Sequence, residues 1–217
     1  MNKITIKPSE NKPSPLKRVG GKIVIIDYGA GNIKSIQFAL QRLGCTAVLS
    51  NDKAEILAAD RVIFPGVGEA GTAMKKLKES KLDTLIPILK QPVLGICLGM
   101  QLMCNSSQEG NTKGLGIFDC TVQKFDTKLK VPQIGWNQIV QLESELFQGI
   151  AEKEYMYLVH SYYAPICKET IAKTNYGIQY SSALQKDNFY GVQFHPEKSS
   201  IAGEQLLRNF LNIKISK

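Results

Sequence analysis

The rhythm of apolar and polar positions changes repeatedly along the first half of the chain, and it predicts strands that alternate with helices. Residues 22–29 (KIVIIDYG) are a nearly unbroken apolar, β-branched run that ends in turn-forming residues, as in a buried strand. The next apolar residues recur at steps of three and four up to Gly44, which predicts an amphipathic helix with a glycine cap; they are Ile33, Ile36, Leu40 and Leu43.

Three further strand patterns follow, in residues 45–50, 61–64 and 92–97. Asp52 and Glu55 have the spacing of a helix-capping box, and residues 72–90 have helical spacing. Helices between successive strands are typical of a parallel, doubly wound sheet. We therefore predict an α/β fold in which helices flank a doubly wound, mainly parallel sheet.

From about residue 114, strand-like segments follow one another with turns between them, which predicts antiparallel strands added in the C-terminal half. These segments are residues 114–125, 131–142, 154–164, 170–176, 180–188 and 189–195, and residues 203–213 are expected to form a last helix. The chain has no internal repeat and no segment typical of an interdomain linker. We expect one domain over residues 22–217, preceded by a poorly ordered basic extension at residues 1–21.

Composition fits a soluble globular protein of 217 residues, 43% of them hydrophobic. The net charge of +8 raises the possibility of nucleic-acid binding, but residues 1–22 hold six basic side chains and one acidic one, which leaves little charge elsewhere. Basic and aromatic residues are not interleaved, so no nucleic-acid partner is expected. No apolar run reaches the ~20 residues that span a bilayer, and no apolar stretch follows Lys3 and Lys7, so a secretory signal is not expected. We expect a cytoplasmic protein with no membrane partner.

Cysteine and histidine usage narrows the possible chemistry. The five cysteines are widely spread and contain no C-x-x-C pair, so neither a disulfide framework nor a zinc site is expected. Cys45, Cys120 and Cys167 have no chemical neighbour in the sequence and are interpreted as structural residues, and Cys104 is interpreted as a core residue. Cys104 is expected on the same helix face as the fifth, Cys97. The chain has only two histidines.

Cys97 stands between Gly95 and Gly99, where a predicted strand passes into a predicted helix. This G-x-C-x-G spacing is that of a nucleophile elbow, whose neighbours must be small because strand and helix crowd together there. Amide N–H groups at the start of the helix would favour the thiolate form of the sulfur. The alternative is a small buried thiol that happens to have glycine neighbours, and the motif alone does not decide between them.

Two other segments supply groups that such a nucleophile needs. His195 and Glu197 lie two residues apart on a segment expected to be extended, so that their side chains share one side and can form a base with its orienting carboxylate. His160 is the rival base, but no acidic residue lies near it in sequence. Residues 65–68 (PGVG) follow a strand and read either as a tight turn or as an oxyanion hole made of free N–H groups.

These three motifs resemble those of the class I (triad) glutamine amidotransferases: PGVG, GICLGMQLM at residues 95–103, and QFHPEKS at residues 193–199. Three longer stretches are similar to those of the glutaminase subunits of imidazole glycerol phosphate synthases: DYGAGNIKS, VPQIGWNQI and LVHSYYA. The resemblance covers about residues 22–213, and it implies the class I glutamine amidotransferase fold. The extension at residues 1–21 departs from the family, in which such subunits begin almost directly with the first strand.

The resemblance implies a role for each matching residue. Cys97 would attack the side-chain amide of glutamine to give a glutamyl thioester. His195, oriented by Glu197, would protonate the departing ammonia and later activate water. The backbone amides of Val67 and Leu98 would stabilise the oxyanion. Glutamine-binding positions would be Gly66, Gly68, Gln101, Glu109, His160, Ser161 and Tyr162.

The resemblance also implies a heterodimer in which ammonia passes to a (β/α)8-barrel cyclase subunit that makes imidazole glycerol phosphate in histidine biosynthesis. Positions that match the partner-facing side are Asn32, Gln133, Trp136, Asn137, Tyr157 and Lys198, although Trp136 could equally be a core residue. No cofactor is expected, because residue 34 is lysine where a dinucleotide fingerprint starting at Gly29 needs its third glycine.

Three alternatives stay open at this point. The same glutaminase could serve a paralogous synthase, for example in surface-sugar biosynthesis. The chain could be a stand-alone cysteine hydrolase of similar fold, although the glutamine-pocket matches argue against this. It could also be a non-catalytic subunit that keeps the fold, but all three triad positions are filled.

Overall fold

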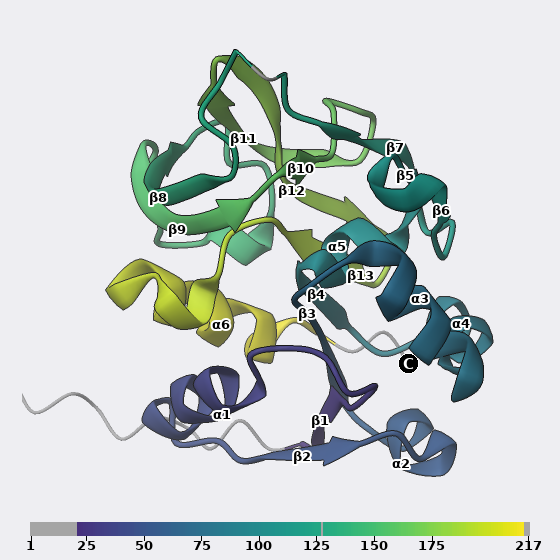
Figure 1. Cartoon of the computed structure of the whole chain (residues 1–217). Coiled ribbons are helices and arrows are strands. Elements are labelled where there is room, and N and C mark those ends of the chain that lie inside the picture. Colours follow the sequence, from purple (N-terminus) through teal and green to yellow (C-terminus); the bar gives the residue numbers. More distant parts are fainter. Residues whose placement is uncertain (1–20, 127, 215–217) are drawn as a thin grey trace, which may run out of the picture.

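The computed structural model describes residues 21–126 and 128–214, which fold around a seven-stranded sheet (Figure 1). The predicted extension lies outside the described residues except for Gly21. The strands stand in the order β11-β12-β13-β4-β3-β1-β2. In that order they are Thr170–Tyr176, Ile178–Lys186, Phe189–Val192, Val93–Cys97, Arg61–Gly66, Ile23–Ile26 and Ala47–Ser50.

Five neighbouring strands of this sheet, from β13 to β2, run parallel. β12 and β11 extend it with antiparallel pairings at the β13 edge. The central strands β1, β3 and β4 are buried along their whole length, as expected for strands covered on both faces. The predicted fold class, a mainly parallel sheet with antiparallel strands added in the C-terminal half, is confirmed.

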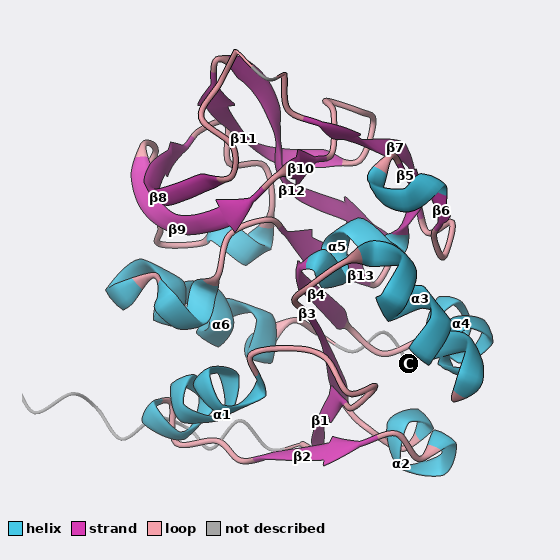
Figure 2. Ribbon diagram, viewed as in Figure 1, coloured by secondary structure: helices cyan, strands magenta, loops and turns pink. Residues whose placement is uncertain are grey.

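Helices cover both faces of the sheet (Figure 2). Ile23 and Ile25 of β1 share a core with α1 (Ile33–Arg42) and α6 (Ser200–Asn212). Val24 and Ile26 point the other way, into the core formed with the remaining helices. These are α2 (Lys53–Leu57), α3 (Ala70–Glu79), α4 (Leu82–Leu85) and α5 (Leu98–Met103). None of the helices in the described part of the chain has the length and apolar character that crossing a membrane requires.

Two small sheets sit beyond the β12 and β13 side of the main sheet (Figure 1). One has the order β10-β7-β5-β6, with bounds Tyr162–Tyr163, Phe118–Lys124, Cys104–Ser107 and Thr112–Lys113. The other pairs β8 (Gln133–Ile139) with β9 (Glu154–His160). Four short 3-10 turns complete the structure: η1 (Ile86–Ile88), η2 (Glu109–Asn111), η3 (Glu145–Phe147) and η4 (Pro196–Lys198).

Two predicted helix ends are confirmed. Gly44 follows α1 with φ of +75°, the left-handed conformation of a glycine cap. Asp52 precedes α2, and its carboxylate accepts a hydrogen bond of 2.8 Å from the Glu55 amide. The helix predicted over residues 72–90 is instead broken, because Lys81 takes a left-handed conformation between α3 and α4.

The expected place of Cys104 on a helix is wrong. Helix α5 stops at Met103, and Cys104 opens strand β5. The cause is the loop around residues 114–117, whose Leu115 and Ile117 amides each donate a 2.8 Å hydrogen bond to the carbonyls of Leu102 and Met103. The loop amides thus take the two carbonyls to which the amides of residues 106 and 107 would bond in a longer helix. Cys104 is nevertheless fully buried, as expected of a core residue.

Candidate active site

Cys97 occupies a sharp turn between strand β4 and helix α5. Its backbone has φ of 54° and ψ of −112°, a conformation that non-glycine residues rarely adopt. Strand β4 ends at Cys97 and helix α5 begins at the next residue. The cysteine side chain therefore lies at the carboxyl end of the parallel strands. This is the edge at which open α/β sheets bind ligands. The strained cysteine therefore stands where the predicted elbow placed it.

Glycines surround this turn because the backbones of β3 and α5 nearly touch. A Cβ added to Gly99 would lie 2.0 Å from the Phe64 carbonyl oxygen, and one added to Gly66 would lie 2.4 Å from the Gly99 nitrogen. At Gly95 on β4, an added Cβ would lie 2.9 Å from the backbone nitrogen of Met100. Real Cβ atoms essentially never come this close to backbone atoms, so three glycines are needed to seat the start of α5 on the sheet.

His195 and Glu197 form a buried hydrogen-bonded pair. The distance from His195 Nδ1 to Glu197 Oε1 is 2.9 Å, and both side chains are at most 3% exposed. The segment is not extended as expected: residues 196–198 form the turn η4, which brings the carboxylate back under the ring. The Ser199 hydroxyl donates to the His195 carbonyl at 2.7 Å and fixes this turn.

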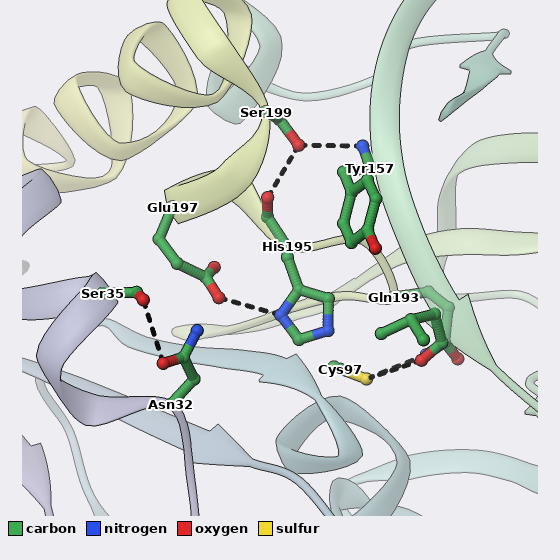
Figure 3. Close-up of polar contacts among 9 residues, drawn as sticks. Asn32, Ser35, Cys97, Tyr157, Gln193, His195, Glu197 and Ser199 are labelled. Atoms are coloured by element: carbon green, nitrogen blue, oxygen red, sulfur yellow. Dashed lines mark hydrogen bonds and ion pairs between the residues drawn. The ribbon is translucent and has the colours of Figure 1, made fainter. Parts of the chain in front are cut away.

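The His195 ring lies between the Glu197 carboxylate and the Cys97 sulfur (Figure 3). Burial alone would lower the pKa of His195, but the sulfur and the carboxylate outweigh burial and raise this pKa to about 10. Nε2 of His195 has no hydrogen-bond partner of its own among the described residues, so the nitrogen on the sulfur side of the ring is available. A cysteine, an imidazole and a carboxylate in this order can act as nucleophile, base and orienting group.

His160 has a different environment. Its Nδ1 lies 2.8 Å from the Tyr162 carbonyl oxygen and its Nε2 lies 3.2 Å from the Tyr180 hydroxyl. Burial lowers the pKa of His160 to about 4, so the ring is neutral at physiological pH. Both of its nitrogens are engaged, and this ring is placed to hold the Ser161–Tyr162 segment rather than to move a proton.

The buried His160 predicts a loss of stability in acid. Its pKa falls from 6.5 to about 4 on folding, so between these values the unfolded chain binds a proton that the folded chain does not. Its stabilising contribution is therefore present above about pH 6.5 and is lost as the pH falls toward 4. His195, whose pKa is raised on folding, contributes no slope in this window.

We expect the urea midpoint of the wild type to drop across this range, and that of His160→Gln to drop less because glutamine does not titrate. Urea titrations of both proteins at several pH values measure the difference. Identical pH dependence in the two proteins would contradict the assignment.

A cavity of about 320 Å³ opens above the sulfur and gathers residues from distant parts of the chain. Glu109 contributes a carboxyl group whose Oε2 accepts a hydrogen bond of 2.9 Å from the Ala70 amide at the start of α3. Burial raises the pKa of Glu109. Among the predicted site residues, the cavity is lined by Asn32, Val67, Gly68, Cys97, Leu98, Gln101, Glu109, His160, Ser161, Tyr162, His195 and Lys198. Gly66 and Glu197 lie behind this lining.

Most residues expected on the partner-facing side are exposed or half-buried. Trp136 is 51% exposed, so the simple core reading of this residue is wrong. Its ring meets that of Tyr157 edge-on, with 6.1 Å between ring centroids, and Lys198 Nζ lies 5.8 Å from the centre of the Tyr157 ring. Asn137 is half-buried and bonds to the Asn175 carbonyl.

Gln133 is the exception among the residues expected at the partner interface. Its side chain is only 3% exposed and is hydrogen-bonded to the Tyr180 hydroxyl at 2.9 Å. Strand β8 alternates its side chains, so Gln133 points inward where Ile134 points out. The structure therefore places Gln133 behind the expected interface, in the same hydrogen-bonded group as His160.

Three residues of the site were not found from the sequence. Tyr28 donates from its buried hydroxyl to the Pro65 carbonyl at 2.8 Å and so supports the start of the PGVG segment. Gln193 is fully buried and lies against Cys97 and Gln101. Ser199 bonds both to His195 and to the Tyr157 amide. Tyr28, Gln193 and Ser199 belong to the motifs DYGAGN and QFHPEKS, so the signal available was their position within stretches already singled out.

The other cysteines are core or half-buried residues, and all five thiols of the chain are free. Three of them, far apart in sequence, gather beside β5 and β7. Cys120 Sγ lies 3.4 Å from Cys104 Sγ, and the contact with Cys104 raises the pKa of Cys120 well above its usual range. The neighbouring Cys120 likewise raises the pKa of Cys167. Thiols that are held protonated, like Cys120 and Cys167, are poor nucleophiles.

Comparison with known proteins gives a consistent result. A model of the glutamine amidotransferase class-I family matches residues 24–213. Imidazole glycerol phosphate synthase subunit HisH of Bacteroides fragilis strain YCH46 is 55% identical over 195 residues, which cover 88% of this chain and 100% of that protein. The protein of the same name from Yersinia pseudotuberculosis serotype I strain IP32953 is 51% identical over 194 residues, 88% of this chain and 99% of that protein.

Solved structures share the fold at lower identity. The crystal structure of a glutamine amidotransferase superimposes with a TM-score of 0.68 at 18% identity, covering 87% of this chain and 96% of the other. A structure of PurLQS from Thermotoga maritima gives a TM-score of 0.65 at 15% identity, covering 88% and 97%. At these identities the likeness concerns the fold alone.

Proposed function

Since this chain belongs to the class I glutamine amidotransferases, among the glutaminase subunits of imidazole glycerol phosphate synthase that serve histidine biosynthesis, we propose that Cys97 is the nucleophile of its glutamine hydrolysis. One observation carries this assignment. Cys97 is held in a strained turn at the floor of the cavity, beside a histidine that a buried carboxylate orients at 2.9 Å. The other four thiols are not in such a setting.

The first half of the reaction forms a thioester. The Cys97 proton moves to Nε2 of His195, and the raised pKa of His195 supports the imidazolium that results. The sulfur then attacks the side-chain carbonyl carbon of glutamine. The tetrahedral oxyanion would be stabilised by the backbone amides of Leu98, at the start of α5, and of Val67, next to the residue that pairs with Cys97 across β3 and β4.

The second half releases the products. His195 gives its proton to the leaving nitrogen, and the carbon–nitrogen bond breaks to leave ammonia and the glutamyl thioester. A water molecule, deprotonated by the same imidazole, then attacks the thioester carbon and frees glutamate and the thiol. Glu197 holds Nδ1 of the ring throughout and so keeps the tautomer that presents Nε2.

The remaining cavity residues fit a glutamine molecule. Its charged α-amino and α-carboxyl groups need polar partners, and the Glu109 carboxyl is a suitable acceptor for the ammonium. Gln101, Gly68 and the Ser161–Tyr162 segment line the same cavity, and Gly66 lies behind this lining. We assign glutamine recognition to Gly66, Gly68, Gln101, Glu109, His160, Ser161 and Tyr162, with His160 acting through the segment that it holds.

The chain is a subunit of a synthase and so has a partner subunit. We assign this partner as a (β/α)8-barrel cyclase that receives the ammonia and makes imidazole glycerol phosphate. Its docking surface would include Asn32, Trp136, Asn137, Tyr157 and Lys198, since Asn32 and Lys198 line the cavity mouth and Trp136 exposes a large ring. A cytoplasmic location also stays a proposal; five free thiols suit a reducing compartment.

Coupling between the subunits tests this function. We expect the purified chain alone to hydrolyse glutamine slowly, and the cyclase of the same organism with its nucleotide ligand to raise glutamate release by about 100-fold. The reason is that the partner would close the cavity beside the exposed Val67, whose amide belongs to the oxyanion site. Full activity without any partner, or stable binding only to a barrel protein of another pathway, would overturn the proposal.

A matched pair of variants tests the surface. Trp136→Ala removes an exposed ring and should weaken association with the cyclase by about tenfold or more. Leu57→Ala removes a side chain of similar exposure, 47% against 51%, on the distant helix α2 and should leave the dissociation constant unchanged.

A further inference from the structure

Gln193 is a buried amide beside the nucleophile. It has no exposed surface and lies directly after β13, two residues before His195. β13 pairs with β4 so that Val192 stands opposite Ile96, and the next residues along the two strands are Gln193 and Cys97. The sheet register therefore brings the side chain to the sulfur, with 3.7 Å between Gln193 Nε2 and Cys97 Sγ. A buried amide is unfavourable unless its groups are hydrogen-bonded, so its contacts define its role.

The orientation of this amide follows from one backbone carbonyl. The Tyr162 oxygen can only accept, so the Gln101 side-chain atom 2.8 Å away must be the nitrogen Nε2. The same nitrogen lies 2.8 Å from the Gln193 side chain, so the atom that faces it must be the oxygen Oε1. The remaining atom of Gln193, 3.7 Å from Cys97 Sγ, is then the nitrogen Nε2. A donor therefore faces the sulfur.

We propose that Gln193 is a further catalytic residue of the glutaminase, whose side-chain N–H donates to the Cys97 sulfur and stabilises the thiolate. This inference rests on the proposed function, because it takes Cys97 as the nucleophile. In the thiol form, Cys97 can donate a hydrogen bond to the Val159 carbonyl oxygen, which lies 3.8 Å from Sγ. Once the proton has moved to His195, the sulfur can only accept, and the N–H donor of Gln193 favours the charged form.

The same chain of hydrogen bonds reaches the glutamine pocket. Both amide hydrogens of Gln101 are used, one by Tyr162 and one by Gln193, so its Oε1 is left as an acceptor at the cavity that Gln101 lines. The hydrogen bond between Gln101 and Gln193 thus fixes both the acceptor for glutamine and the donor at the sulfur. Removing Gln193 should therefore affect kcat through the sulfur and KM through Gln101.

Two substitutions separate these contacts. Gln193→Glu keeps an oxygen for Gln101 but replaces the donor at the sulfur by a carboxylate oxygen, whereas Gln193→Met removes both contacts at similar length. In the complete synthase we expect both variants to lower kcat for glutamine hydrolysis by about 10²-fold. Only Gln193→Met should also raise KM. Synthesis from ammonium salts should be unchanged, because the partner subunit carries out that step. Co-purification with the cyclase shows that the variants fold and bind the partner.

The pH dependence of Cys97 alkylation gives a readout that a structural role would not move. Iodoacetamide labelling of the peptide that contains Cys97, followed by mass spectrometry, should show half-maximal reactivity about one pH unit higher in both variants. Gln91→Glu is the matched control. Gln91 is also buried, and its side-chain nitrogen donates a hydrogen bond of 2.7 Å to the Ile56 carbonyl. It precedes β4 and so lies at the end of that strand opposite to Cys97. This control variant should leave the labelling profile at its wild-type position.

The outcomes are distinguishable. A wild-type labelling profile in both Gln193 variants would overturn the role at the sulfur, and so would a loss of activity in Gln193→Met without one in Gln193→Glu. If Cys97→Ala kept glutamine-dependent synthesis, the proposed function itself would fail. If Cys97→Ala lost it while the Gln193 variants matched the wild type, only the inference on Gln193 would fail.

Discussion

Cys97→Ala should lower glutamine-dependent synthesis in the complete synthase by at least about 10³-fold while leaving synthesis from ammonium salts unchanged. The substitution removes the sulfur that forms the thioester, so no nucleophile is left to attack the side-chain amide of glutamine. Alanine keeps the Cβ atom, so the turn at φ of 54° keeps its shape. Added ammonia bypasses the step that the variant lacks. Both activities are measured by formation of imidazole glycerol phosphate with glutamine or with ammonium chloride.

Cys104→Ala provides the control for loss of a thiol. Cys104 is fully buried seven residues further along the chain and touches Cys120 rather than the cavity, so both activities should persist. Loss of both activities in Cys97→Ala would mean that the cysteine has a structural role. Retention of both would mean that another group attacks glutamine.

Gly99→Ala should destabilise the protein by about 3 kcal/mol or more, although alanine is the better helix former. The added methyl group would stand 2.0 Å from the Phe64 carbonyl oxygen, and neither the β3 backbone nor the start of α5 can yield without losing contacts. Helix propensity alone predicts stabilisation by about 1 kcal/mol, so the two effects have opposite signs. Urea unfolding monitored by circular dichroism measures the difference.

Gly44→Ala separates crowding from backbone strain. Gly44 has φ of +75° but no atom within 4 Å of an added Cβ, so alanine there meets strain without a clash. We expect a loss of about 1 kcal/mol, clearly smaller than that at Gly99. Equal effects at the two sites, or a Gly99→Ala protein as stable as the wild type, would be incompatible with the close packing of α5 on β3.

Much of the fold could be predicted because its signals are local. The buried run of β1 and the helical spacing before Gly44 depend on neighbours within a few residues. The end of α5 could not be predicted in this way. It depends on Leu115 and Ile117, which take the helix carbonyls from a loop that the sequence does not show to be near. The break at Lys81 is a single left-handed residue for which the helical spacing gives no warning.

The candidate site likewise contains residues that short stretches of sequence reveal and residues that only distant contacts reveal. Cys97 and the His195–Glu197 pair carry chemistry that is recognisable in short stretches of sequence, and the structure brings them together. Gln193 could not be assigned, because an amide becomes significant only through its partners, and Gln101 lies 92 residues away. Gln133 was expected at the partner interface and is buried. Successive side chains of a strand point to opposite faces of the sheet, so a shift of one position moves a residue from the exposed face to the buried one.

The close approach of β3 and α5 has a consequence for how this protein can change in evolution. Gly66, Gly95 and Gly99 are required by any folded chain of this shape, whether or not it reacts with glutamine. A duplicated gene released from selection for catalysis would therefore be expected to lose Cys97 or His195 long before it lost these glycines. Among distant descendants, the glycine spacing is a record of inherited architecture, and the residues at positions 97 and 195 show whether the chemistry has survived.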